Sequence, residues 1–229
     1  MKQFFYLFIA FTLSGCVSSS VLFQDGRTLG QDEFNVALSA SYNFTPEYNL
    51  DSANSKVNIN PDRFPAPWIQ LQGQYGLVDR MDVGASVGVG LLSFGMQGFT
   101  KFSLFENERF GVSILGLAGF STLNENEIDP DEGSVFYHNF MGALPISYRL
   151  NPSNEIVVQP IFSRDNYRYN VPDGTRKIIG NHHNLYYKLG LGYIRENKNK
   201  NRIFYNVTLG YYQERDLILP TVGIAFFPD

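Results

Sequence analysis

The chain has 229 residues, of which 44% are hydrophobic and 17% are charged, and its formal net charge is −4. This length suits one barrel-sized domain or two small ones, and this composition excludes a largely disordered chain. The aromatic content of 15%, mostly Tyr and Phe, together with 21 glycines favours an all-β protein. No cluster of basic residues is dense enough to indicate nucleic-acid binding.

The amino terminus has the pattern of a secretory signal peptide. Lys2 supplies the positive end and residues 4–13 the apolar core, which at about ten residues is too short to cross a bilayer as a helix. The core ends in Leu13-Ser14-Gly15-Cys16, which resembles the lipobox of bacterial lipoproteins at all four positions. The resemblance implies cleavage before Cys16, diacylglycerol on its sulfur and an acyl chain on the new amino terminus. The alternative is an ordinary signal peptide with a chance cysteine.

Cys16 is the only cysteine in the chain. An exported protein with one thiol cannot form an internal disulfide, which favours lipidation over the chance cysteine. Two or three acyl chains make a firm anchor, since each buried methylene contributes about 0.8 kcal/mol. Val17 and three serines follow, and we expect them to form a short flexible tether.

The first strand is predicted from Phe34 to Phe44, where apolar residues alternate with Asn and Ser. This alternation resembles the first strand of small bacterial outer-membrane β-barrel proteins. Residues 45–66 contain three prolines and show no periodicity, so a long polar loop is expected there. The next two strands occupy residues 69–77 and 81–91. Pairing Leu77 with Met81 predicts a three-residue loop, and pairing Leu91 with Phe94 predicts a two-residue turn.

The same unit repeats to the end of the chain. Further strands are predicted at residues 94–104, 110–120, 135–148, 156–163, 185–193, 203–211 and 217–227. In the closing hairpin Tyr211 is expected opposite Ile218, and Val207 opposite Val222. The strand at 110–120 is apolar or small on both faces. Pro145 and Pro160 lie inside predicted strands, where each removes a backbone donor, so we expect a bulge or a bend there.

These elements predict a single antiparallel up-and-down meander β-barrel of about ten strands. The connections longer than a dozen residues (45–66, 121–134 and 164–183) all fall on one end, and the short polar turns on the other. The resemblance to outer-membrane barrels implies a transmembrane barrel with long loops outside and short turns in the periplasm. It also implies a final aromatic, here Phe226 or Phe227, that the outer-membrane assembly machinery reads.

Periodicity does not show which face points outward. A lipocalin-like barrel turns its apolar face inward around a greasy ligand, and this alternative stays open. In the transmembrane arrangement six polar side chains are expected in the lumen, as a hydrogen-bonded plug rather than an open pore: Gln70, Gln72, Gln74, Asp82, Lys101 and Lys188.

Catalytic chemistry is weakly represented. His138, Ser163, Asp165 and His183 could lie near one rim, as in barrels that modify lipids, but their spacing matches no known motif. No metal site or cofactor is predicted. A second set of side chains forms a modest basic loop region that suggests solvated charge or binding to lipopolysaccharide: Arg164, Arg168, Arg176 and Lys177.

The sequence therefore predicts a signal peptide (1–15), a lipidated tether (16–32) and a β-barrel domain (33–229). The predicted function is that of a Gram-negative, porin-like outer-membrane lipoprotein with a structural, adhesive or limited solute-passage role. The expected partners are membrane lipid through acylated Cys16, the outer-membrane bilayer, the assembly machinery, and lipopolysaccharide or a surface ligand. The alternatives are a periplasmic lipid-anchored module that binds an apolar ligand and, less favoured, a lipid-modifying enzyme at the rim.

Overall fold

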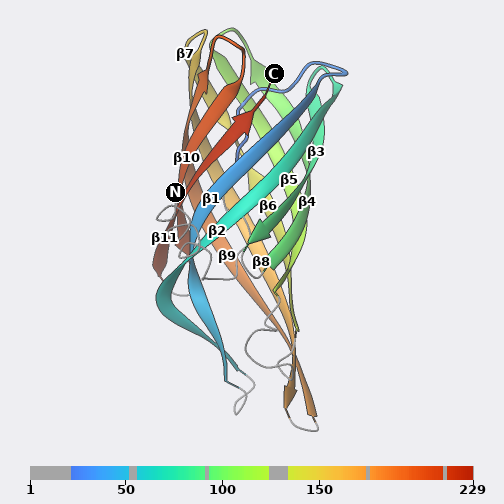
Figure 1. Cartoon of the computed structure of the whole chain (residues 1–229), viewed down its shortest axis with the longest axis vertical. Helices are drawn as coiled ribbons and strands as arrows, with labels where there is room; N and C mark the ends of the chain where they lie inside the picture. Colours follow the sequence, from blue (N-terminus) through green and yellow to red (C-terminus); the bar gives the residue numbers. More distant parts are fainter. Residues whose placement is uncertain are drawn as a thin grey trace, which may run out of the picture.

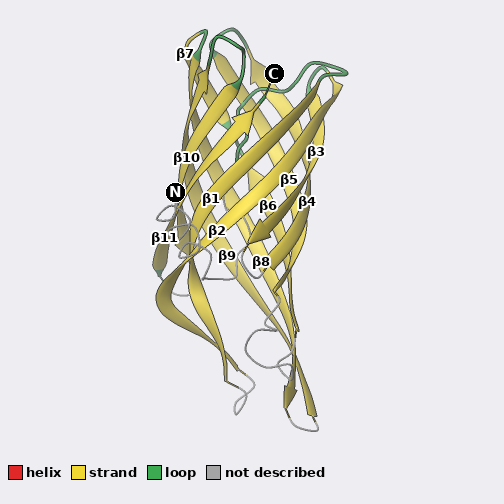
Figure 2. Ribbon diagram, viewed as in Figure 1, coloured by secondary structure: helices red, strands yellow, loops and turns green. Residues whose placement is uncertain are grey.

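The structure is a computed structural model that describes residues 22–51, 56–90, 93–123, 134–173, 176–213 and 216–228, which form a closed antiparallel β-barrel without helices (Figures 1 and 2). The strands are β1 (Phe34–Asp51), β2 (Lys56–Val78), β3 (Met81–Gly90), β4 (Ser93–Glu106), β5 (Phe110–Leu123), β6 (Ser134–Ala143), β7 (Ile146–Asn151), β8 (Asn154–Asp173), β9 (Arg176–Glu196), β10 (Arg202–Tyr212) and β11 (Leu217–Phe227). No helix in these ranges could cross a membrane.

The barrel has ten strand positions because β6 and β7 are two halves of one interrupted strand. Both halves pair with β5 and with β8, and Leu144 and Pro145 separate them. Each of the other strands pairs with its sequence neighbours, and β1 closes the ring on β11, with Tyr42 opposite Val222. The prediction of an all-β meander of ten strands is confirmed.

The connections differ strongly in length at the two ends of the barrel. The turns β2–β3, β4–β5, β7–β8 and β9–β10 lie together at the upper end in Figure 1, while the hairpins β1–β2 and β8–β9 project from the lower end. The prediction of loops at 45–66 and 164–183 is wrong, because the backbone stays paired from Phe44↔Pro65 to Asp51↔Lys56 and from Arg164↔Leu185 to Asp173↔Arg176. The sequence analysis missed these strand extensions because their residues are mostly polar and show no alternation.

The predicted registers hold for the closing hairpin and change near two turns. Tyr211 pairs with Ile218 and Val207 with Val222, as predicted. At the β2–β3 turn a bulge brings Val78 opposite Met81, so the predicted three-residue loop is wrong and only Asp79 and Arg80 turn. The β3–β4 register is two residues from the prediction, with Val89 rather than Leu91 opposite Phe94. A shift of two keeps the same face, so the alternation survives.

The two prolines are accommodated differently. Pro145 interrupts its wall between β6 and β7, and its carbonyl accepts a hydrogen bond from the Ser113 amide at 3.0 Å. Pro160 stays within β8 opposite Leu189, and its carbonyl accepts from the Leu144 amide at 3.0 Å. The register is the same on both sides of the break, with Ala143 opposite Ile161 and Ile146 opposite Val158, so the expected bulge is absent.

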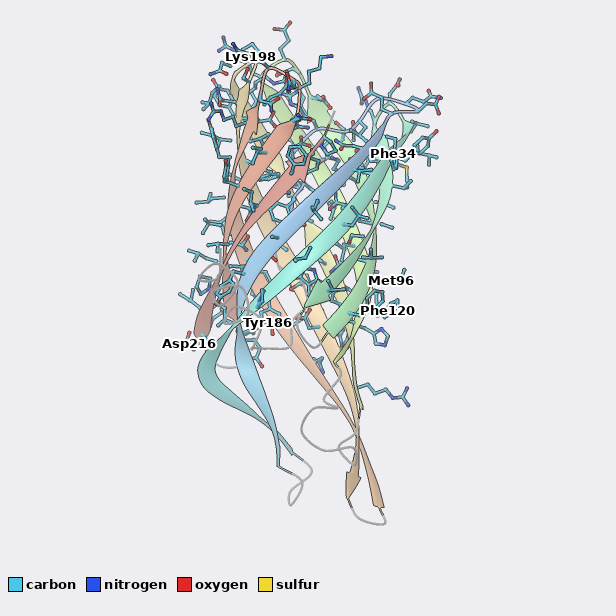
Figure 3. All side chains as sticks on the ribbon, in the orientation of Figure 1. Phe34, Met96, Phe120, Tyr186, Lys198 and Asp216 are labelled. Carbon is cyan, nitrogen blue, oxygen red and sulfur yellow. The ribbon has the colours of Figure 1, made fainter. Side chains whose placement is uncertain are left out.

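The apolar face of the strands points outward and the polar face points into the barrel. On β11, for example, Ile218 and Val222 are 56% and 44% exposed, while Thr221 is 4% exposed. Figure 3 shows the same outward direction for the labelled side chains of Phe34, Met96 and Phe120. This arrangement is the reverse of a lipocalin-like barrel, in which the apolar face would be buried.

Candidate functional site: the lumen and its inner segment

The described residues that precede the first strand begin inside the lumen. Leu22, Phe23 and Gln24 are 5%, 3% and 2% exposed, and we call residues 22–29 the inner segment. In Figure 1 its trace passes through the upper part of the barrel to the rim where β1 begins. The sequence assigned these residues to the tether (16–32). Residues 1–21, which include Cys16, lie outside the described part of the chain.

Two apolar side chains fix the inner segment at its deep end. Leu22 belongs to a buried cluster with Phe99, Leu115, Leu117, Met141, Ala143 and Ile161. Phe23 belongs to another, with Val157, Ile194, Phe204 and Ala225, and its ring meets that of Phe204 edge-on at 5.8 Å. Full burial of one such side chain contributes roughly 1.5–3 kcal/mol. The lumen therefore holds this segment by specific packing as well as by polar contacts.

Hydrogen bonds from the walls satisfy the backbone of the inner segment. The Leu22 carbonyl accepts from Asn206 Nδ2 at 3.4 Å, and the Gln24 carbonyl accepts from Gln159 Nε2. The Gln24 side chain in turn donates from Nε2 to Gln74 Oε1 at 3.1 Å. These partners come from β2, β8 and β10, so the segment is contacted from several sides of the barrel.

Asp25 is the electrostatic centre of the segment. Its Oδ1 lies 3.4 Å from Lys101 Nζ on β4, and its Oδ2 lies 2.7 Å from Arg202 on β10. Burial raises the pKa of the Asp25 carboxyl, but Lys101 and Arg202 outweigh burial and hold the pKa well below its usual range. Asp25 is therefore ionised at neutral pH and joins two walls that are not neighbours in the sheet.

Two glycines allow the segment and the wall to approach closely. A Cβ on Gly26 would lie 2.1 Å from the Gly111 carbonyl oxygen, so the two backbones touch there. A Cβ on Gly223 would lie 2.6 Å from the Phe23 ring. Any side chain at either position would collide with the inner segment or its wall, which is why glycine is required at both.

The segment reaches the rim through Arg27 and Leu29. Arg27 Nη1 donates to the Asn107 carbonyl at 2.7 Å and lies 3.4 Å from Glu106 Oε1. The Leu29 amide donates to both carboxylate oxygens of Asp82, at 3.1 and 3.2 Å. A cavity of about 280 Å³ remains at this mouth, and the segment itself forms part of its lining.

The structure places the six predicted lumen residues on the inner face. Gln70, Gln72, Gln74, Asp82 and Lys101 are each at most 7% exposed, and Asp82 is fully buried. Gln74 Nε2 donates to Asp82 Oδ2 at 2.6 Å, and Lys101 Nζ lies 3.4 Å from the same oxygen.

Lys188 stands apart from the other five lumen residues. It is half-buried on β9, with its Nζ 5.1 Å from the ring of buried Tyr186. Nothing described links it to the inner segment.

The residues considered for catalysis do not share a face. His138 is exposed on the outer face of β6, whereas Ser163 and Asp165 on β8 are buried on the inner face. His183 is also exposed.

The other charged and metal candidates add no site. Arg164 and Arg168 are exposed, while the side chains of Arg176 and Lys177 lie outside the described residues. Within the described ranges, no three His, Cys, Asp or Glu side chains gather as metal ligands.

Sequence reasoning missed the inner segment, although one signal pointed to it. The strand at 110–120 is apolar on both faces, and Leu115 and Leu117 on its inner face pack in the cluster that holds Leu22. A second apolar face inside a narrow barrel needs an apolar partner there. Leu22 and Phe23 are an adjacent apolar pair in the stretch between the serines and the first strand.

Comparison with known proteins finds similarity of fold only. No family model and no curated protein matches the sequence. Among solved structures, the outer membrane protease OmpT from Escherichia coli is 11% identical, with 89% of this chain and 97% of that chain covered and a TM-score of 0.48. The translocator domain of the autotransporter NalP from Neisseria meningitidis is 8% identical, with 88% and 89% covered and a TM-score of 0.47. Ail of Yersinia pestis is 12% identical, with 86% and 99% covered and a TM-score of 0.30.

Proposed function

We propose that this protein is a lipoprotein of the bacterial outer membrane whose barrel crosses the bilayer, closed at rest, with a structural or adhesive role. The observation that carries the proposal is the continuous apolar outer surface of the barrel. In water such a surface would be far larger than the few hundred Å² that soluble monomers expose. In a bilayer it is the surface that lipid requires.

The outer surface has the order of a transmembrane belt. Exposed aromatic side chains lie toward both ends of the barrel, and exposed aliphatic side chains lie between them. The aromatic residues toward the short-turn end are Phe34, Tyr75, Phe102, Phe105, Phe110, Tyr193, Tyr205 and Phe226, and those toward the other end are Phe94, Phe120, Phe140, Phe162, Tyr187 and Tyr211. The aliphatic residues between them include Leu38, Leu71, Val87, Ile114, Leu191, Val207 and Val222. On β5, Phe110 and Phe120 are separated by about 25 Å along the barrel axis, if the strand rises 3.4 Å per residue and tilts by about 40°. That spacing equals the height of the apolar band of outer-membrane barrels.

The inner face opposes the lipocalin-like alternative. Two of its three apolar clusters are occupied by Leu22 and Phe23 of the chain itself, and the third is formed by Tyr186 and Tyr212. Apart from Trp68, the buried side chains on β2 and β3 are polar. A barrel that carries a greasy ligand needs an apolar cavity instead. The cavity at the short-turn mouth is lined by charged groups such as Arg27, Glu155 and Arg202.

The two long hairpins support an adhesive role. The β1–β2 and β8–β9 hairpins extend beyond the aromatic belt at the same end of the barrel (Figure 1). Their paired backbones offer stiff, elongated structures to the cell exterior. The lipid on Cys16 adds a second attachment to the membrane, and it belongs to the proposal on the strength of the lipobox.

Trypsin treatment of intact cells tests the proposal. We expect cleavage only at sites within residues 45–66 and 164–183, which contain Lys56, Arg63 and Arg168, while the barrel survives. Cleavage at these sites should need no permeabilisation of the cells. Complete protection in intact cells, followed by full digestion after osmotic release of the periplasm, would establish a periplasmic module instead.

A further inference from the structure

The inner segment leaves the barrel closed by a part of the chain that is not a strand. Ten strands enclose a wider interior than eight, and eight already enclose a space that side chains can fill. In this barrel many inner positions are Gly or Ser, and among the described residues the segment fills the middle of the lumen from Leu22 to Asp25. Small side chains therefore leave the lumen wide, and a segment of the chain that is not part of the barrel sheet occupies the space.

We propose that the inner segment is a gate, and that its release from Lys101 and Arg202 opens a pore for ions and small polar solutes. The inference depends on the proposed function only because the barrel must span a bilayer for the pore to conduct. The solute class follows from the lining, which carries both signs of charge. Lys101 lies beside Asp82 of the neighbouring strand, and Arg202 and Glu155 both line the mouth.

The contacts of the gate are of a kind that can be released. Asp25 is 11% exposed, close to the water of the mouth, and its two cations retain other acceptors after release. Lys101 keeps Asp82 at 3.4 Å, and Arg202 keeps the nearby carboxylates of Glu155 and Glu196. An uncompensated buried charge, which would make release very costly, therefore does not remain on the wall.

Two substitutions weaken the gate from opposite sides. Asp25→Asn keeps the shape of the side chain and removes the charge between the two cations. Gly223→Leu places a side chain where the Phe23 ring lies. The matched controls are Asp216→Asn, the same chemical change at the exposed end of β10–β11, and Gly142→Leu, where a Cβ meets nothing within 4 Å on the outer face.

The experiment measures conductance in planar bilayers and tryptic cleavage after Arg27 in detergent, with all five proteins first shown to migrate as folded barrels in unboiled gels. The wild type and both controls should stay closed and protected. Asp25→Asn and Gly223→Leu should each show frequent openings and cleavage after Arg27 at least about tenfold faster, as expected for loss of a charge-assisted contact.

Each other outcome has one meaning. Folded gate variants that stay closed and protected would overturn the gate, and so would openings without cleavage after Arg27, since the pore would then open elsewhere. A wild type that conducts steadily would also overturn it, even if both gate variants fail to fold. Failure of the wild type to insert into bilayers at all would count against the membrane barrel, while the cleavage assay still reports on the gate.

Discussion

Val222→Arg is the sharpest test of the lipid-facing surface. Val222 lies at the centre of β11, five residues from Leu217 and five from Phe227, and its side chain is 44% exposed on the outer face. Five residues along a strand tilted by about 40° correspond to roughly 13 Å, which places Val222 near the middle of an apolar band about 25 Å tall. An arginine at that depth costs about 2–4 kcal/mol.

The assay is equilibrium unfolding by guanidinium in phospholipid vesicles, followed by the fluorescence of Trp68, the only tryptophan of the chain. Ile218→Arg is the matched control, because it changes the same face of the same strand near its end and should cost only about 0–1 kcal/mol. Thr221→Arg points inward, where Thr221 is 4% exposed, and should destabilise by overpacking. Equal costs for Val222→Arg and Ile218→Arg would refute the membrane belt.

Three further predictions test other parts of the molecule. Cys16→Ser should abolish labelling by radioactive palmitate, and equal label in the wild type and the variant would contradict lipidation of Cys16. Asp82→Asn should lower the free energy of unfolding by about 1–3 kcal/mol, because it weakens acceptors for the Leu29 amide and Lys101; an unchanged guanidinium midpoint would contradict this. Gly88→Leu should displace the indole of Trp68, since a Cβ there would lie 2.4 Å from its Nε1, and a tryptophan emission maximum unchanged from wild type would show that the indole has not moved.

The sequence predicted the barrel well where alternation was regular and the turn was short. In the closing hairpin, a two-residue turn and a strict period of two leave only one register that keeps both apolar faces aligned, and the pairing of Val207 with Val222 follows. The bulge near Leu77 was not predictable, because it changes the turn and leaves the faces intact. The extensions of β1 and β8 were missed because polar, proline-containing runs carry no period.

The inner segment could not be predicted from local pattern. Its contacts join residues far apart in the chain: Gln24 and Gln159 are 135 positions apart, and Leu22 and Asn206 are 184 apart. No spacing rule relates such residues until the ring is closed. The sequence analysis identified Gln74 and Asp82 as inward-facing. It missed their partners, the Gln24 side chain and the Leu29 amide, because it assigned residues 16–32 to a tether.

The bridge made by Asp25 has a consequence for how the barrel is assembled. β1 and β11 are the first and last strands, so the ring closes only after the whole chain is present, and such long-range closure is slow. In the folded barrel Asp25 links β4 and β10, which no strand pairing joins directly. A contact of this kind that forms before β1 meets β11 shortens the effective loop that the seam must close and lowers the entropy cost of that step. The inner segment is placed to supply such a contact, because it precedes β1 and touches both β4 and β10.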